Sequence, residues 1–108
     1  MKRVLIICAA GMSSSLIAKK ATHYFEGVGK EIEVEAIHVA SGVEQIMADE
    51  FDLYLVSPQT KMHVDKLKEA TLKKDKPLGQ IPQEAYIPIP AGIGKLAAMI
   101  EQMLGLDG

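Results

Sequence analysis

Short apolar runs alternate with segments of helical periodicity along the chain, and this alternation constrains the fold more than any other feature. The run Val4–Ile7 has the unbroken apolar character of a strand that is buried on both faces, as parallel sheets require. Strands that alternate with helices favour a parallel sheet with right-handed crossovers and helices on both faces. We therefore predict a single α/β domain built on a four-stranded, parallel, open sheet.

Local signals set the expected boundaries of the elements. Ser13 or Ser14 is expected to cap the first helix, and Ser41 with Glu44 fits a capping box for the second helix. Glutamates alternate with apolar residues in the second strand, which indicates an edge position. In chain order the predicted elements are a strand at 4–7, a helix from 13 or 14 to 27, a strand at 32–39, a helix at 43–47, a strand at 53–56, a helix at 60–74, a strand at 78–81 and a helix at 93–104.

Composition excludes several classes of protein. The chain of 108 residues is 48% hydrophobic and 24% charged, which argues for one globular domain and against disorder. A formal net charge of −2 supplies no overall attraction for nucleic acid or anionic lipid. The apolar run near the start is too short for a signal peptide, and no stretch approaches a membrane span, so we expect a cytoplasmic protein.

The segment after the first strand carries the clearest chemical signal. Cys8 is the only cysteine, so it forms no intramolecular disulfide, and it precedes small residues and then three serine hydroxyls. Backbone N–H groups in such a loop converge on a tetrahedral anion, and the start of a helix adds a positive dipole end that favours the thiolate. Cys8 is therefore interpreted as a nucleophile in an anion-binding loop. The alternative is that it is a small core residue at a strand end.

Motifs that are absent from the sequence narrow the range of ligands and reactions that it indicates. Neither the Gly-x-x-x-x-Gly-Lys-Ser/Thr nor the Gly-x-Gly-x-x-Gly signature occurs, so nucleotide triphosphates and dinucleotides are not indicated. Cysteine-dependent phosphatases use Cys-x-x-x-x-x-Arg, whose arginine clamps the phosphate, but Ser14 stands at that position and Arg3 is the only arginine. A phosphocysteine formed here is expected to persist long enough to be handed on.

Two further places in the sequence are candidates for parts of the site. Ligands of open parallel sheets bind at the carboxyl ends of the strands, so Pro58 and Gln59, after the third strand, are predicted to form the rim facing the loop. The alternative is that they only terminate that strand. His38 is a weaker candidate for a phosphoryl acceptor, and none of the three histidines has a partner at metal-ligand spacing.

These residues resemble a known family. The segment Val4–Ser15 is similar to the phosphocysteine loop of the enzyme IIB components of the bacterial sugar phosphotransferase system (PTS), lactose/cellobiose/chitobiose family. The segment Leu55–Gln59 resembles the family's third strand, which commonly ends in Gly-Pro-Gln, with Ser57 here at the glycine position. The resemblance covers essentially residues 1–108. It implies a fold similar to those of low-molecular-weight phosphatases and flavodoxin-like proteins.

The resemblance also implies a mechanism. Cys8 would accept a phosphoryl group from a phosphohistidine of a IIA protein and pass it to a disaccharide bound by the membrane transporter IIC, as part of a protein-N-phosphohistidine:sugar phosphotransferase. Metal ions and organic cofactors are not needed, and the protein would be cytoplasmic with a transient association at the membrane through IIC. The phosphate-binding residues would be Ala9, Ala10, Gly11, Met12, Ser13, Ser14 and Ser15.

Two other functions stay open from the residues alone. One is a small cysteine-dependent phosphatase or arsenate reductase, against which the missing loop arginine argues. The other is a regulatory domain that binds an anion without catalysis. The regulatory domain predicts that Cys8→Ser leaves ligand binding intact.

Overall fold

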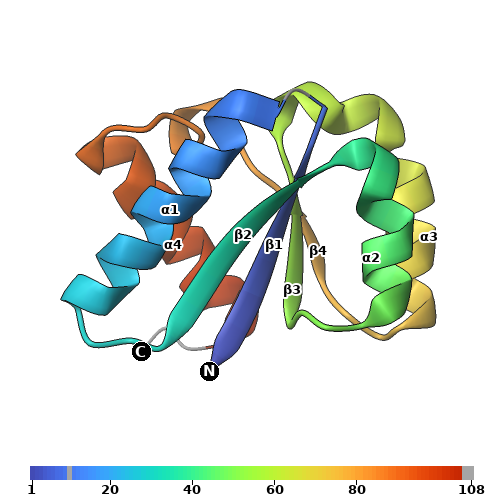
Figure 1. The fold of residues 1–108 in the computed structure, drawn as a ribbon, viewed down its shortest axis with the longest axis horizontal. Helices are drawn as coiled ribbons and strands as arrows, with labels where there is room; N and C mark the ends of the chain where they lie inside the picture. Colours follow the sequence, from blue (N-terminus) through green and yellow to red (C-terminus); the bar gives the residue numbers. More distant parts are fainter. Residues whose placement is uncertain (10, 106–108) are drawn as a thin grey trace.

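A computed structural model of the chain describes residues 1–9 and 11–105, with the side chains of Met12, Ser13 and Lys61 also outside the description. Four parallel strands form one sheet in the order β2-β1-β3-β4. Helices pack on both faces of this sheet (Figure 1). The elements are β1 (Lys2–Cys8), α1 (Gly11–Gly27), β2 (Ile32–His38), the 3-10 helix η1 (Val39–Ser41), α2 (Gly42–Ala48), β3 (Leu53–Val56), the 3-10 helix η2 (Pro58–His63), α3 (Val64–Lys73), β4 (Leu78–Gln80), the 3-10 helix η3 (Gln83–Ala85) and α4 (Pro90–Leu104).

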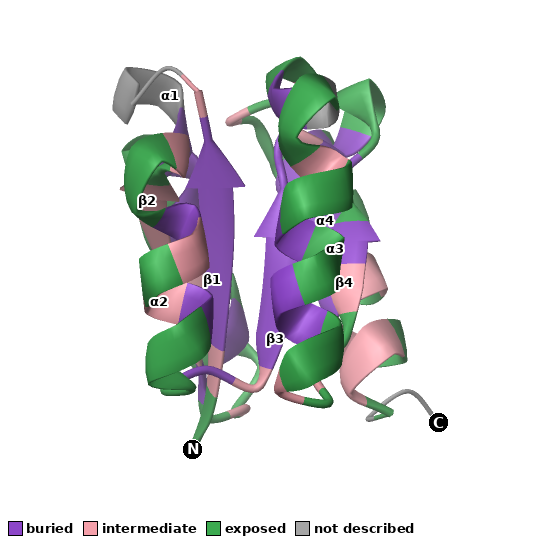
Figure 2. Cartoon of the chain, turned by 90° about the vertical axis from the view of Figure 1, so that its right-hand side faces the viewer, coloured by how far each residue is buried: buried purple, intermediate pink, exposed green. Residues whose placement is uncertain are grey.

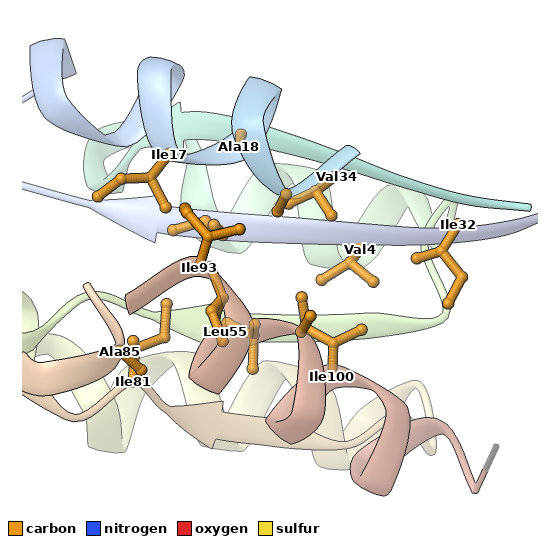
Figure 3. Packing of buried hydrophobic residues seen from close by; sticks show 14 of the residues in the cluster. Val4, Ile17, Ala18, Ile32, Val34, Leu55, Ile81, Ala85, Ile93 and Ile100 are labelled. Atoms are coloured by element: carbon orange, nitrogen blue, oxygen red, sulfur yellow. The ribbon is translucent and has the colours of Figure 1, made fainter. Parts of the chain in front are cut away.

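The sheet separates two apolar cores because side chains alternate between its faces. In β1, Val4 and Ile6 point to the core under α1 and α4, whereas Leu5 and Ile7 point to the core under α2 and α3. Figure 2 shows the strands buried and the outer sides of the helices exposed. Figure 3 shows the first of these cores, where Ile93 and Ile100 of α4 lie among side chains of the strands and of α1.

The predicted fold class is confirmed, and so is the edge position of the second strand. β2 pairs only with β1 among the described residues, and β1 lies inside the sheet between β2 and β3. β1 is longer than the predicted strand at 4–7, because Lys2 and Arg3 continue the pairing with β2. β4 forms within the proline-rich region close to the predicted place, at Leu78–Gln80.

Three of the four predicted helix starts are wrong, whereas α2 begins directly after Ser41, as expected. α1 begins at Gly11, so Ser13 and Ser14 lie within its first turn and do not cap it. Ser41 precedes α2 but makes no side-chain cap hydrogen bond, since its backbone (φ −100°, ψ 5°) is not in the extended region that a capping side chain needs. The helix predicted over 60–74 is divided into η2 and α3, and α4 begins at Pro90 rather than at residue 93.

The proline at the first position of α4 accounts for the last of these differences. A proline there lacks only an N–H group that would have no intrahelical partner, so it favours a helix start.

No helix in residues 1–9 and 11–105 is long and apolar enough to cross a membrane.

Candidate active site around Cys8

The strand order places Cys8 at a switch point of the sheet. From β1 the chain adds β2 on one side, and it then adds β3 and β4 on the other side. In open α/β sheets, ligands bind outside the carboxyl ends of the two strands where the order reverses. Here those strands are β1 and β3, whose last paired residues are Ile7 and Val56. Cys8 lies directly after that pair, as the last residue of β1, the strand that runs upward from the N-terminus in Figure 1.

The sulfur of Cys8 lies beside a serine hydroxyl. Its Sγ is 2.8 Å from the Oγ of Ser14, and Cys8 and Ser14 are only 2% and 1% exposed. The Sγ also lies 3.5 Å from the carbonyl oxygen of Ile37 on β2. Ser14 occupies the position of the arginine in the phosphatase motif and is oriented toward the cysteine. The first turn of α1 therefore brings a neutral hydroxyl to the sulfur in place of a cation.

The backbone near Cys8 suits an anion. α1 starts at Gly11, and the first N–H groups of a helix have no acceptor within the helix. These groups and the helix dipole favour negative charge at this end. Of the predicted phosphate-binding residues, Ala9 is half-buried and Ser15 is exposed. Ala10 and the side chains of Met12 and Ser13 lie outside the described residues, so their predicted roles stay predictions.

The end of β3 forms the neighbouring part of this edge. Ser57 is 1% exposed, its N–H donates to the carbonyl of Ile7, and its Oγ lies 2.6 Å from the Oγ1 of Thr60. This pair of buried hydroxyls holds the turn that presents Pro58 and Gln59. The structure places Pro58 and Gln59, the residues predicted to form the rim, in a groove of about 270 Å³, which is lined by Pro58, Gln59, Gln83, Tyr86 and Ile87.

Tyr86 is a site residue that the sequence analysis missed. It follows η3, and it lines the same groove as Pro58 and Gln59. Burial raises the pKa of Tyr86 to about 12, and negative charge on Cys8 adds to the rise. Tyr86 lies in the proline-rich stretch, where no periodicity points to it. The sequence signal that could have pointed to Tyr86 is its position shortly after β4, because all strands of a parallel sheet end at the same edge, where Cys8 also lies.

The weaker candidates lie differently. His38 ends β2 as the register partner of Cys8, but it is exposed and its Nδ1 accepts a hydrogen bond from the Ala40 N–H at 3.1 Å. Arg3 is near the other end of β1, five residues from Cys8, or roughly 16 Å along an extended strand. There it contacts Glu33, Glu35 and Glu50. Arg3 therefore does not substitute for the missing loop arginine.

A groove larger than the one beside Pro58 and Gln59 lies elsewhere on the molecule. It measures about 600 Å³ and lies between α1 and β2, with charged and polar side chains such as Lys19, Glu26 and Glu33 in its lining. A cluster of histidine, cysteine or acidic side chains that could hold a metal ion is absent from residues 1–9 and 11–105. Cys8 and Ser14 therefore remain the chemically distinctive group.

The fold and this group define a small α/β protein that carries a buried cysteine at a sheet switch point, next to the start of a helix. Comparison with known families gives the particular assignment. The model of the family described as "PTS system, Lactose/Cellobiose specific IIB subunit" matches residues 3–96. The chain belongs to this family of IIB components of the sugar phosphotransferase system, as its resemblance in sequence indicated.

Individual relatives agree with this assignment. The chain is 30% identical over 69 residues to the PTS system oligo-beta-mannoside-specific EIIB component of Bacillus subtilis (strain 168), a match that spans 64% of this chain and 65% of that protein. The cellobiose-specific phosphotransferase IIB component of Borrelia burgdorferi is similar in structure, with a TM-score of 0.63, 26% identity, and coverage of 95% of this chain and 86% of the other.

A third relative supports the fold. The lactose-specific IIB component domain from Streptococcus pneumoniae has a TM-score of 0.80 and covers 94% of this chain and 96% of its own. At 14% sequence identity this likeness concerns the fold alone. The same arrangement of strands and helices is therefore kept by two very different sequences.

Proposed function

We propose that this protein carries phosphoryl groups in sugar uptake, with Cys8 as the residue that holds them. The supporting observation is the position of its sulfur: Cys8 lies at the switch point, 2.8 Å from the Ser14 hydroxyl and beside the start of α1. Membership in the IIB family supplies the reaction class. The donor is the phosphohistidine of a IIA protein, and the acceptor is a sugar of the cellobiose, lactose or chitobiose class bound by the membrane protein IIC.

The first step moves the phosphoryl group onto sulfur. The Cys8 thiolate attacks phosphorus in line with the bond to the imidazole nitrogen of the donor. The P–S bond forms while the P–N bond breaks, and the imidazole leaves with the electron pair and takes up a proton. Backbone N–H groups from Ala9 to Ser15 and the hydroxyls of Ser13 and Ser14 bind the phosphoryl oxygens. Pro58 and Gln59 form the rim against which the donor protein is placed.

The second step returns the thiolate. A hydroxyl oxygen of the sugar attacks phosphorus, the P–S bond breaks, and sulfur keeps the electron pair. The proton of that hydroxyl passes to a base, which this scheme assigns to IIC because the sugar is bound there. The reaction requires positioning and charge stabilisation only, and the protein acts in the cytoplasm with transient contacts at the membrane.

The lack of an arginine in the loop favours a carrier over a phosphatase. Hydrolysis of a phosphocysteine requires stabilisation of the charge that develops when water attacks, which an arginine supplies in cysteine-dependent phosphatases. Ser14 is at that position, and Arg3 lies at the other end of β1. The phosphocysteine is therefore expected to survive until an acceptor is bound.

Intact-mass measurement after incubation with a phosphorylated IIA protein tests the proposal. The wild type and His38→Ala should each gain one phosphoryl group, and Cys8→Ser should gain none. His38→Ala is the matched control, because it removes the weaker candidate for the phosphoryl acceptor, which is the register partner of Cys8. Failure of the wild type to gain mass with several IIA donors, together with release of phosphate from an aryl phosphate, would indicate a phosphatase. An adduct on Cys8→Ser would exclude Cys8 as the carrier.

A further inference from the structure

We propose that Thr22 of α1 closes the open edge of the sheet and thereby prevents two copies of this chain from pairing through β2. The inference does not depend on the proposed function. Among the described residues β2 pairs with β1 alone, so the other side of β2 is an edge of the sheet. An open edge presents backbone N–H and C=O groups to which a strand of another chain can pair, and native proteins protect such edges.

The ladder between β1 and β2 shows which backbone groups of β2 point outward. It starts where the N–H of Lys2 donates to the carbonyl of Glu31. Along a strand, successive residues direct their N–H and C=O groups to opposite sides, so the odd-numbered residues of β2 bond to β1. The groups of Ile32, Val34 and Ala36 therefore point away from β1, and Val34 lies in the middle of the open edge.

The hydroxyl of Thr22 occupies both outward groups of Val34. The N–H of Val34 donates to the Thr22 Oγ1 at 2.9 Å, and the same oxygen lies 3.2 Å from the carbonyl oxygen of Val34. Thr22 Oγ1 also lies 3.0 Å from the carbonyl oxygen of Ala18 in its own helix. A hydroxyl accepts and donates at the same time, so this one side chain takes the place that a neighbouring strand would take.

The groove between α1 and β2 shows that the bulk of the helix does not close this edge. α1 runs alongside β2 (Figure 1). The groove nevertheless measures about 600 Å³, and Thr22, Val34 and Ala36 are part of its lining. That space would let another strand approach β2. The hydrogen bonds of the Thr22 hydroxyl are therefore the barrier to pairing at Val34.

The charges on β2 protect the edge only in part. Two copies that pair through the same edge are related by a two-fold axis. With the axis at Val34, Glu33 of one copy lies opposite Glu35 of the other, and like charges in that position repel. However, Arg3 lies 3.6 Å from Glu33 and 2.8 Å from Glu35, which offsets their charge. Repulsion alone therefore does not keep two copies apart.

Sedimentation velocity over a range of protein concentrations tests the inference. Thr22→Val keeps the branched shape of the side chain and removes the hydroxyl, so the outward groups of Val34 lose their partner. The average mass of Thr22→Val should rise with concentration above that of the wild type, toward twice its value. Thr22→Ser, which retains a hydroxyl, should match the wild type. Equal masses for Thr22→Val and the wild type at every concentration would overturn the inference.

Two further variants show whether any association uses this edge. Thr71→Val is the matched control, because Thr71 is a helical threonine whose Oγ1 donates to the Lys68 carbonyl of its own helix at 2.9 Å. Ala36→Pro removes an outward N–H, which an edge strand tolerates, so adding it to Thr22→Val should abolish the association. Association of Thr71→Val as strong as that of Thr22→Val, or unchanged association of the double variant, would refute pairing through β2.

Hydrogen exchange in the wild type tests the contact without any substitution, so it holds even if Thr22→Val folds poorly. The N–H groups of Val34 and Ala36 both point outward, but only that of Val34 has a hydrogen-bond acceptor among the described residues. Residue-resolved exchange should therefore be slower at Val34 than at Ala36, by roughly tenfold. Exchange at Val34 as fast as at Ala36 would show that the Thr22 hydroxyl does not close the edge.

Discussion

The hydroxyl oxygen of Ser14 lies 2.8 Å from the sulfur of Cys8, and both residues are almost completely buried. The contact joins the last residue of β1 to the first turn of α1, so it depends on how directly the strand leads into the helix. Because α1 already begins at Gly11, the Ser14 side chain is directed at the sulfur instead of capping the helix.

Removal of this hydroxyl should weaken the nucleophile without unfolding the protein. We expect Ser14→Ala to slow the alkylation of Cys8 at neutral pH by roughly tenfold or less, the range of one lost hydrogen bond. Ser41→Ala is the control, since Ser41 is exposed and makes no side-chain cap hydrogen bond. Equal rates for the two variants, measured by mass spectrometry over time, would show that the hydroxyl does not act on the sulfur.

Two glycines of α4 should respond in opposite ways to the same substitution. Gly92→Ala places a methyl group 2.5 Å from the Ile87 carbonyl oxygen, so it should reduce the free energy of unfolding by about 1–3 kcal/mol. A Cβ at Gly94 meets nothing within 4 Å, and alanine is the better helix former by roughly 1 kcal/mol. Gly94→Ala should therefore stabilise the protein in urea unfolding. A stabilised Gly92→Ala would contradict the close packing.

The ion pair between Arg3 and Glu35 should make the protein less stable at acidic pH than at neutral pH. The hydrogen bond from Arg3, at 2.8 Å, lowers the pKa of Glu35 below its usual 4.5. The folded state thus binds this proton less readily than the unfolded state, and the stabilisation is present above pH 4.5 and lost as pH falls through the lowered pKa. Because both side chains are partly exposed, the effect should be at most about 1 kcal/mol.

Urea unfolding of Glu35→Gln across acidic pH checks this sign. The stability difference from the wild type should be largest near neutral pH and should shrink as the solution becomes more acidic. Glu44→Gln is the control, because Glu44 is exposed and has no ion pair among the described residues. A difference that stays constant across pH would mean that the ion pair contributes nothing measurable.

Tyr86 should make the protein less stable as the pH rises in the alkaline range. Its pKa is raised from 10 to about 12, so above pH 10 the folded state retains a proton that the unfolded state loses. The free energy of unfolding should therefore fall as pH rises from 10 toward about 12, by no more than about 2 kcal/mol.

The control for alkaline unfolding separates Tyr86 from the other tyrosines. The alkaline loss of stability should be reduced in Tyr86→Phe and kept in Tyr24→Phe, as measured by urea unfolding at fixed alkaline pH. Part of the loss should remain in Tyr86→Phe, since burial also raises the pKa of Tyr54. An identical pH slope in the wild type and Tyr86→Phe would show that the Tyr86 hydroxyl is not held by the fold.

The sequence by itself determined the parallel sheet, the order of its elements and the neighbourhood of Cys8. Buried strands and amphipathic helices leave periodic patterns, and a strand followed by a short loop and a helix is a local structure. The residues from Val4 to Ser15 are contiguous, so the contact between Cys8 and Ser14 needs only the correct local geometry. Sequence patterns capture such geometry well, although they missed where the helix begins.

The helix starts were decided by packing rather than by residue preference. Ser41 has the right side chain for a cap, but the turn of η1 sets its backbone outside the required region. Thr60 was predicted inside a helix, but it is buried and its hydroxyl lies next to that of Ser57. At Thr60 this contact with the end of β3 outweighed the helical pattern, whereas after Ser41 the helix α2 formed without the side-chain cap.

Only the tertiary structure decided that Tyr86 lies beside Pro58 and Gln59. These residues lie far apart in the chain, and no local rule links a tyrosine in a proline-rich segment to the end of a distant strand. Their proximity follows from the order β2-β1-β3-β4, from the burial of Ala85 and from the space that Gly92 leaves for Ile87. Each of these is a packing relation between separate elements, and it exists only once the whole sheet has formed.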